Sequence, residues 1–281
     1  MIFYFEINQS LIKRYLLVIF DKVTQTIMEQ KDKIKQSLKI YLEKSDFNEF
    51  NLKSVIFDMD GVLYDSMPAH DKSWRETIDE LNLKHEPYEF YMQEGRLGKS
   101  TINEIFQRNL QRDSTEEEEE KIYARKSELF KQYNSGETLP GSKEVLNYVK
   151  EKGLTPVLVT GSGQPSLLDK LSYHFPGIFT PETMVTAFNV TNGKPHPEPF
   201  ILGLQKGGNL LPNQAIVIEN APLGVKSAVA AGILTIAVNT GPLHDDVLLD
   251  AGAAIVFHSV KELSDNFPLI LDNINEFRLQ M

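Results

Sequence analysis

The sequence predicts an α/β protein with a doubly wound parallel sheet and a helical domain inserted after the first strand. Five short apolar runs rich in β-branched residues recur along the chain, and none alternates with polar residues. Such runs are typical of strands buried on both faces of a parallel sheet. Segments with helical periodicity separate most of the runs, and strand–helix alternation builds a doubly wound sheet. One long helical stretch interrupts this alternation, and it predicts the inserted domain.

The predicted elements follow one another in a regular order. The strands are expected at Ser54–Phe57, Pro156–Thr160, Ala215–Glu219, Leu234–Val238 and Ala254–Phe257. The core helices are expected at about 142–152, 164–174, 197–207, 222–231 and 259–277. Residues 51–67 and 140–281 would form this core. Residues 68–139, roughly 70 in number, are too long for a loop and predict a helical cap with helices near 69–82, 99–112 and 115–133.

Residues 1–50 do not resemble the rest of the chain. Residues 28–44 have a helical rhythm, with Ile34, Leu38 and Leu42 on one stripe. This segment is a helix packed on the body, a poorly ordered extension, or the true start of translation at Met28, and the sequence leaves the three alternatives open. Charged residues interrupt the apolar runs of the first 20 residues, so a signal peptide is not expected.

Composition excludes several classes of protein. The 281 residues carry a net charge of −10, which argues against a nucleic-acid binder. The absence of cysteine excludes disulfides and thiolate sites and favours a cytoplasmic protein. No stretch reaches the roughly 18 apolar residues of a membrane helix. An anionic substrate would need a local cluster of positive charge or a metal ion in so acidic a protein.

Reactive side chains follow the apolar runs at the carboxyl ends of the predicted strands. Ligands of open α/β sheets bind at these ends, which converge in space. We therefore expect one site to contain Asp58 and Asp60, Thr160 and Ser162, Glu219 and Asn220, and Lys194 from a loop before a helix.

The carboxylates of Asp58 and Asp60 indicate metal-assisted phosphoryl transfer. Asp58 and Asp60 repel each other, and a hard divalent cation such as Mg²⁺ relieves that repulsion and also binds phosphate oxygens. Asp58 could then attack phosphorus as a nucleophile, while Asp60 acts as general acid and base. Thr160 and Lys194 would hold the transferring oxygens, and the ammonium group would offset their charge.

Four segments in this order resemble the motifs of the haloacid dehalogenase superfamily of phosphatases and mutases. They are Phe57–Ser66, Val159–Gly163, Gly193–Pro195 and Ile218–Lys226. The resemblance covers about residues 53–260, and the insertion is similar to the helical cap of the β-phosphoglucomutase-like branch. An Asp-x-Asp pair alone is a weak signal, whereas four motifs in order at strand ends are a strong one.

Within that branch, four stretches are similar to a β-phosphoglucomutase-like inorganic pyrophosphatase. They are Tyr91–Arg96, Leu154–Gly163, Val217–Gly224 and Ala237–Pro242. This resemblance implies hydrolysis of pyrophosphate to phosphate through an aspartyl-phosphate, with Mg²⁺ as cofactor. It implies that the metal is held by Asp58, the backbone carbonyl of Asp60 and Asn220, with Glu219 near and Glu94 reaching it from the cap.

The fourth motif departs from the family pattern at Asn220, where most members have a second carboxylate. The amide keeps an oxygen ligand but removes one negative charge. Glu94 could restore that charge when the cap closes, which would couple metal binding to closure. A less negative core would also suit a small, highly charged anion such as pyrophosphate.

Alternatives remain within and outside this class. A β-phosphoglucomutase or a hexose-phosphate phosphatase would share the first half-reaction, but the mutase branch has an arginine near the position of Gly98. A catalytically silent module is disfavoured because every reactive residue is present. Arg96, Lys99 and His70 are candidate substrate contacts together with Ser162, although each also has a purely structural interpretation. The expected partner is a small phosphorylated substrate, pyrophosphate or a sugar phosphate, and the expected state is a monomer.

Overall fold

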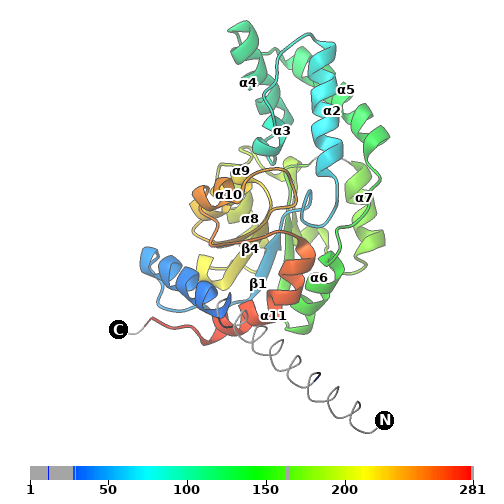
Figure 1. Cartoon of the computed structure of the whole chain (residues 1–281). Helices are drawn as coiled ribbons and strands as arrows, with labels where there is room; N and C mark the ends of the chain where they lie inside the picture. Colours follow the sequence, from blue (N-terminus) through cyan, green and yellow to red (C-terminus); the bar gives the residue numbers. More distant parts are fainter. Residues whose placement is uncertain (1–11, 13–27, 29, 163–164, 280–281) are drawn as a thin grey trace, which may run out of the picture.

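The computed structural model describes residues 12, 28, 30–162 and 165–279. Its six strands are all parallel, in the order β3-β2-β1-β4-β5-β6 (Figure 1). Helices flank the sheet, so the predicted doubly wound α/β fold is confirmed. The short β3 was not predicted. The strands are β1 (Ser54–Phe57), β2 (Thr155–Val159), β3 (Met184–Val185), β4 (Ala215–Glu219), β5 (Leu234–Val238) and β6 (Ile255–Phe257).

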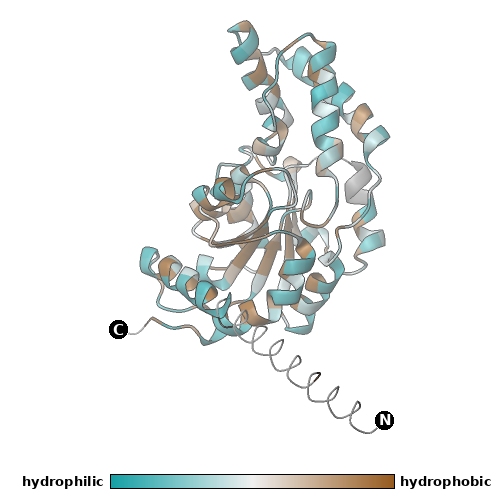
Figure 2. Cartoon of the chain, viewed as in Figure 1, coloured by the Kyte–Doolittle hydropathy of each residue, from teal (hydrophilic) through white to brown (hydrophobic). Residues whose placement is uncertain are grey.

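Both faces of the sheet are covered, which explains why its strands do not alternate with polar residues. Val55 and Phe57 belong to one apolar cluster, whereas Ile56 between them belongs to another with Phe200. Figure 2 shows the central strands as hydrophobic and the outer helices as mixed. The core helices are α6 (Ser142–Glu151), α7 (Pro165–His174), α8 (Glu198–Lys206), α9 (Pro222–Ala230), α10 (Asp245–Asp250) and α11 (Val260–Glu276), with 3₁₀ turns at Pro181–Thr183, Ala187–Asn189 and Pro212–Gln214.

The insertion after β1 forms a separate helical layer at one end of the sheet (Figure 1). It comprises α2 (Met67–Glu80), α3 (Glu89–Met92), α4 (Gly98–Leu110) and α5 (Glu116–Tyr133). We call this layer the cap. It has its own apolar cluster around Trp74, Ile102 and Phe106. The acidic run that begins α5 follows a capping box, in which the Thr115 hydroxyl accepts the N–H of Glu118.

Two crossings join the cap to the core, and they lie side by side. The Asp65 N–H donates to the Glu137 carbonyl at 3.0 Å, and the Leu139 N–H donates to the Leu63 carbonyl at 3.0 Å. The cap is therefore joined to the core by two adjacent backbone segments that are hydrogen-bonded to each other. Such a connection suits a body that moves over the sheet as a unit.

An N-terminal helix over residues 30–44 packs against the core, as in the first of the three alternatives. Its buried stripe is Ile34, Leu38 and Leu42, and the Ser37 hydroxyl donates to the Ala254 carbonyl at 2.7 Å. The signal-peptide expectation concerns the first 20 residues, which lie almost wholly outside the described part of the chain. Within the described part, no helix has the length and apolar character needed to cross a membrane.

Leu38→Ala is expected to lower the free energy of unfolding by about 2–5 kcal/mol, because it leaves a cavity in the core. The Leu38 side chain is 1% exposed, whereas Ile40 on the opposite face of the same helix is 42% exposed. Ile40→Ala is therefore the matched control, with an expected change within about 0.5 kcal/mol. Urea unfolding monitored by circular dichroism measures both. Equal losses in the two variants would show that the helix does not pack as described.

Candidate active site

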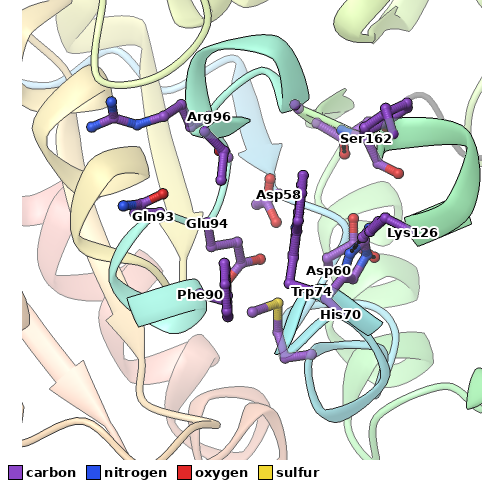
Figure 3. Close-up of a pocket in the computed structure, with 17 residues that line it drawn as sticks. Asp58, Asp60, His70, Trp74, Phe90, Gln93, Glu94, Arg96, Lys126 and Ser162 are labelled. Carbon is purple, nitrogen blue, oxygen red and sulfur yellow. Dashed lines mark hydrogen bonds and ion pairs between the residues drawn. The ribbon is translucent and has the colours of Figure 1, made fainter. Parts of the chain in front are cut away.

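The register of the sheet brings the predicted reactive residues to one edge. Phe57 is aligned with Leu158 on one side and with Ile218 on the other, so the residues that follow these three emerge together. The Asp58 N–H donates to the Ile218 carbonyl at 3.0 Å, which extends the ladder by one residue. Thr160 follows β2 in the same way, and its hydroxyl accepts the Ser162 N–H at 2.9 Å. Asp58 therefore faces the cap from the middle of the sheet (Figure 3).

Lys194 lies between two buried carboxylates. Its Nζ is 2.5 Å from Asp58 Oδ1 and 2.6 Å from Glu219 Oε1, and the lysine is only 2% exposed. Burial alone would lower the pKa of Lys194, but the charges of both carboxylates raise it above its usual value. Burial raises the pKa of Asp58 to about 8, and Lys194 opposes that rise while Glu219 and Asp60 add to it.

The second carboxylate oxygen of Glu219 is held in place by backbone hydrogen bonds. Its Oε2 accepts the backbone N–H of Asn220 at 2.7 Å and that of Ala221 at 2.8 Å. A Cβ at Gly224 would lie 1.7 Å from Glu219 Oε1, so the glycine makes room for the carboxylate. Since both oxygens of Glu219 already accept hydrogen bonds, the geometry fits a role in holding Lys194 better than direct contact with the metal, near which the sequence predicts Glu219.

Asp60 has a different environment from Asp58. The Ser66 hydroxyl donates to Asp60 Oδ1 at 2.5 Å, and His70 Nε2 lies 3.3 Å from the same oxygen, near but poorly aligned for a hydrogen bond. Burial would raise the pKa of Asp60, but the charge of His70 and the hydrogen bond from Ser66 hold it below its usual value. The two neighbouring carboxyls are thus shifted in opposite directions, which is typical of groups with different tasks.

Lys126 is a buried cap residue that sequence analysis did not identify. Its Nζ lies 2.7 Å from His70 Nδ1, so His70 stands between Lys126 and Asp60. Burial lowers the pKa of Lys126 to about 7. Its position on the apolar face of α5 could have identified it in the sequence, because Ile122 and Phe130 lie one turn to either side. A lysine on such a stripe is buried for a reason other than packing.

The cap touches the core directly beside these residues. Asn220 Nδ2 donates to Glu94 Oε2 at 2.8 Å, which joins the unusual amide to the carboxylate expected to compensate for it. A Cβ on Gly161 would lie 2.6 Å from the carbonyl oxygen of Gly95, so the two backbones are nearly in contact. Burial and the charge of Asp58 raise the pKa of Glu94 well above its usual value. The structure therefore has the cap closed over the strand ends.

The oxygen atoms at this seam fit a hard divalent cation. Asn220 Oδ1 and Glu94 Oε1 are both buried and have no hydrogen-bond partner, although buried acceptors are nearly always satisfied. Unpaired amide and carboxylate oxygens beside a buried Asp58 are ligands that Mg²⁺ accepts. Over the described residues no cluster of three His, Asp or Glu side chains has ligating geometry. The expected donor set, which includes an amide and a backbone carbonyl, does not require one.

A cavity of about 60 Å³ lies between the cap and the strand ends (Figure 3). Arg96 borders it but is ion-paired with Glu104 at 2.6 Å. Lys99, an expected substrate contact, is exposed and lies outside this cavity on an outer groove. The groups lining the cavity are Asp58, Asp60, Met67, His70, Trp74, Phe90, Gln93–Arg96, Gly98, Thr101, Tyr123, Lys126 and Thr160–Ser162.

Known proteins are similar to this chain in sequence and in fold. The model of the haloacid dehalogenase-like hydrolases matches residues 52–232. Hexitol phosphatase A of Escherichia coli is 30% identical over 213 residues, which are 75% of this chain and 93% of that protein. The phosphorylated carbohydrates phosphatase of Thermotoga maritima is 30% identical over 207 residues, which are 72% of this chain and 92% of that protein. A putative β-phosphoglucomutase from Bacteroides vulgatus has a TM-score of 0.84 and 49% identity, over 88% of this chain and all of that chain.

Proposed function

This chain belongs to the haloacid dehalogenase-like hydrolase family, and from that premise we propose that it hydrolyses small phosphorylated sugars or polyols through a phosphorylated Asp58. The observation that carries the proposal is the geometry at Asp58. Its carboxylate borders the cavity, and Lys194 lies 2.5 Å away where charge would develop in the transition state.

The two half-reactions divide between the two aspartates. Asp58 attacks the phosphorus and the bond to the leaving oxygen breaks, while Asp60 gives that oxygen a proton. In the second half-reaction Asp60 removes a proton from water, and the water oxygen displaces Asp58 to release phosphate. The lowered pKa of Asp60 keeps this carboxyl ionised at neutral pH, which is the form that removes a proton from water, so Asp60 must bind a proton before the first half-reaction. Thr160, Ser162 and Lys194 orient the phosphoryl oxygens.

The donor set supports Mg²⁺ as the cofactor. Asp58, the backbone carbonyl of Asp60, Asn220 and Glu94 would hold it. It would supply the positive charge that neutralises phosphoryl oxygens and favours ionised Asp58. Because Glu94 belongs to the cap, closing the cap would add to the site the negative charge that the neutral amide of Asn220 does not supply.

The relatives support a sugar or polyol phosphate better than the pyrophosphate expected first from sequence. Two of them are phosphatases named for a hexitol or for phosphorylated carbohydrates. One observation still favours inorganic pyrophosphate as a second candidate. The cavity of about 60 Å³ is small beside the roughly 300–1,000 Å³ of ordinary ligand sites.

Phosphate release in the presence of Mg²⁺ distinguishes the candidates. We expect kcat/KM to be highest for a sugar or polyol phosphate in a panel of glycerol 1-phosphate, hexitol and hexose phosphates and pyrophosphate. A higher value for pyrophosphate would favour the second candidate. The assay is repeated with EDTA, which should remove the activity. Release from no substrate, or conversion of β-glucose 1-phosphate to the 6-phosphate, would contradict the proposal, and the latter would indicate a mutase.

A further inference from the structure

Glu94 lies on a cap segment that has little helical structure of its own. The segment runs from α3, a helix of four residues, to the start of α4 at Gly98. A single helical turn is not stable alone, so contacts with the rest of the cap must fix its position. In Figure 3 the side chain of Glu94 points into the cavity, whereas those of Gln93 and Arg96 point away from Asp58. The residues on either side of Glu94 can therefore anchor the segment while Glu94 faces the core.

A buried ion pair joins the part of the segment before Glu94 to α4. Arg108 Nη1 and Nη2 donate to Glu89 Oε1 and Oε2 at 2.8 and 2.9 Å, and the Glu89 side chain is 4% exposed. Bidentate pairs of this kind are both strong and directional. Glu89 Oε1 also accepts a hydrogen bond from Gln93 Nε2 at 3.0 Å, and Oε2 accepts one from the Glu86 N–H at 2.8 Å. Glu89 thus ties Gln93, the residue just before Glu94, to α4.

A second ion pair joins the part of the segment after Glu94 to the same helix. Arg96 Nη1 lies 2.6 Å from Glu104 Oε2. Glu104 precedes Arg108 by four residues, so the two lie one turn apart on one face of α4. The segment supplies the acid of one pair and the base of the other. Moving it along α4 by one turn would place Arg96 beside Arg108, which like charge disfavours. The two pairs therefore specify one register for the segment that carries Glu94.

We call the two pairs, Glu89–Arg108 and Arg96–Glu104, the α4 brace. We propose that the α4 brace positions Glu94 as a ligand of the divalent cation. The inference rests on the proposed function, because it assumes that Glu94 contributes to the Mg²⁺ site. Glu89, Glu104 and Arg108 do not line the cavity, so they are positioning residues. A ligand that is held in place beforehand loses less conformational entropy on binding, so the brace should strengthen metal binding.

Binding of Mn²⁺ to the metal-free protein tests the α4 brace without any substrate. Electron paramagnetic resonance follows the loss of the signal of unbound Mn²⁺. We expect Arg108→Met to raise the Kd for Mn²⁺ about tenfold, which is within the range of losses found when groups that support metal ligands are removed. Arg108→Lys keeps the charge but not the bidentate geometry, and its Kd should lie between those of the wild type and Arg108→Met.

Arg112→Met is the matched control for this substitution. Arg112 also forms a bidentate pair within the cap, with Glu118 at 2.9 and 2.6 Å, but neither residue belongs to the segment that carries Glu94. Its Kd for Mn²⁺ should equal that of the wild type.

A double-mutant cycle shows whether Arg108 acts through Glu94. Glu94→Gln is expected to weaken Mn²⁺ binding by itself. In that background Arg108→Met should change the Kd by less than about twofold, because the ligand that Arg108 positions is already altered. A general effect on the fold of the cap would give the same loss in both backgrounds.

Three results would overturn the inference while phosphate release by the wild type stands. They are a wild-type Kd in Arg108→Met, a wild-type Kd in Glu94→Gln, and equal losses from Arg108→Met in the two backgrounds. If Arg108→Met fails to fold, Glu104→Gln, which removes the charge of the other pair, takes its place in the cycle. A wild-type protein that binds Mn²⁺ but releases phosphate from no substrate would instead refute the proposed function.

Discussion

Asp58→Asn is expected to reduce phosphate release by at least about 10⁴-fold, the order of loss seen when a catalytic nucleophile is removed. The amide has nearly the same shape as the carboxylate but cannot attack phosphorus. Stability should not fall, because the substitution removes a charge that burial already disfavours, as the raised pKa of Asp58 indicates. A steady-state phosphate assay and a thermal unfolding curve measure the two effects on the same sample.

Asp65→Asn provides the control for this substitution. Asp65 is exposed and does not line the cavity, so its variant should keep wild-type turnover. Acid quenching during turnover, followed by mass spectrometry, should detect phosphorylated protein in the wild type and in Asp65→Asn but not in Asp58→Asn. Turnover within about a hundredfold of the wild type in Asp58→Asn would mean that another group, or water, attacks the phosphorus.

The sequence predicted the sheet and the strand-end residues because both depend on local patterns. A buried parallel strand is a continuous apolar run, and the residue that ends it is read directly from the chain. The long helices of the cap were predicted within about two residues, which is ordinary for helix ends. By contrast, β3, α3 and α10 have two, four and six residues, and these are too short to carry a period that distinguishes strand from helix.

The sequence did not identify those site residues whose positions depend on how the cap packs on the core. Lys126 and Tyr123 lie on α5, and the closed cap places them in one cavity with Asp58. Lys99 shows the opposite case, because it was a candidate substrate contact, yet its side chain lies on the outer surface. The orientation of a helix over a sheet is set by packing among distant residues, and no local pattern records it.

Lys194→Met is expected to weaken both folding and catalysis. The change leaves Asp58 and Glu219 buried without their cation, and breaking a buried ion pair in this way costs about 3–5 kcal/mol. Turnover should fall by at least about 10²-fold, because the charge that faces the transferring oxygens is lost. Lys226→Met is the matched control, since Lys226 is exposed on α9 and does not line the cavity.

The loss of stability should depend on pH. Without Lys194, Asp58 can stay buried only by binding a proton, so its pKa in the folded variant rises further above its usual value. A carboxyl whose pKa is higher in the folded than in the unfolded protein stabilises the fold below about pH 4, and that contribution disappears as pH rises through the folded value. The difference in unfolding free energy between wild type and Lys194→Met should therefore be larger at pH 8 than at pH 5. Urea unfolding in EDTA at both pH values measures it, and a difference that shrinks towards pH 8 would show that Lys194 does not compensate these carboxylates.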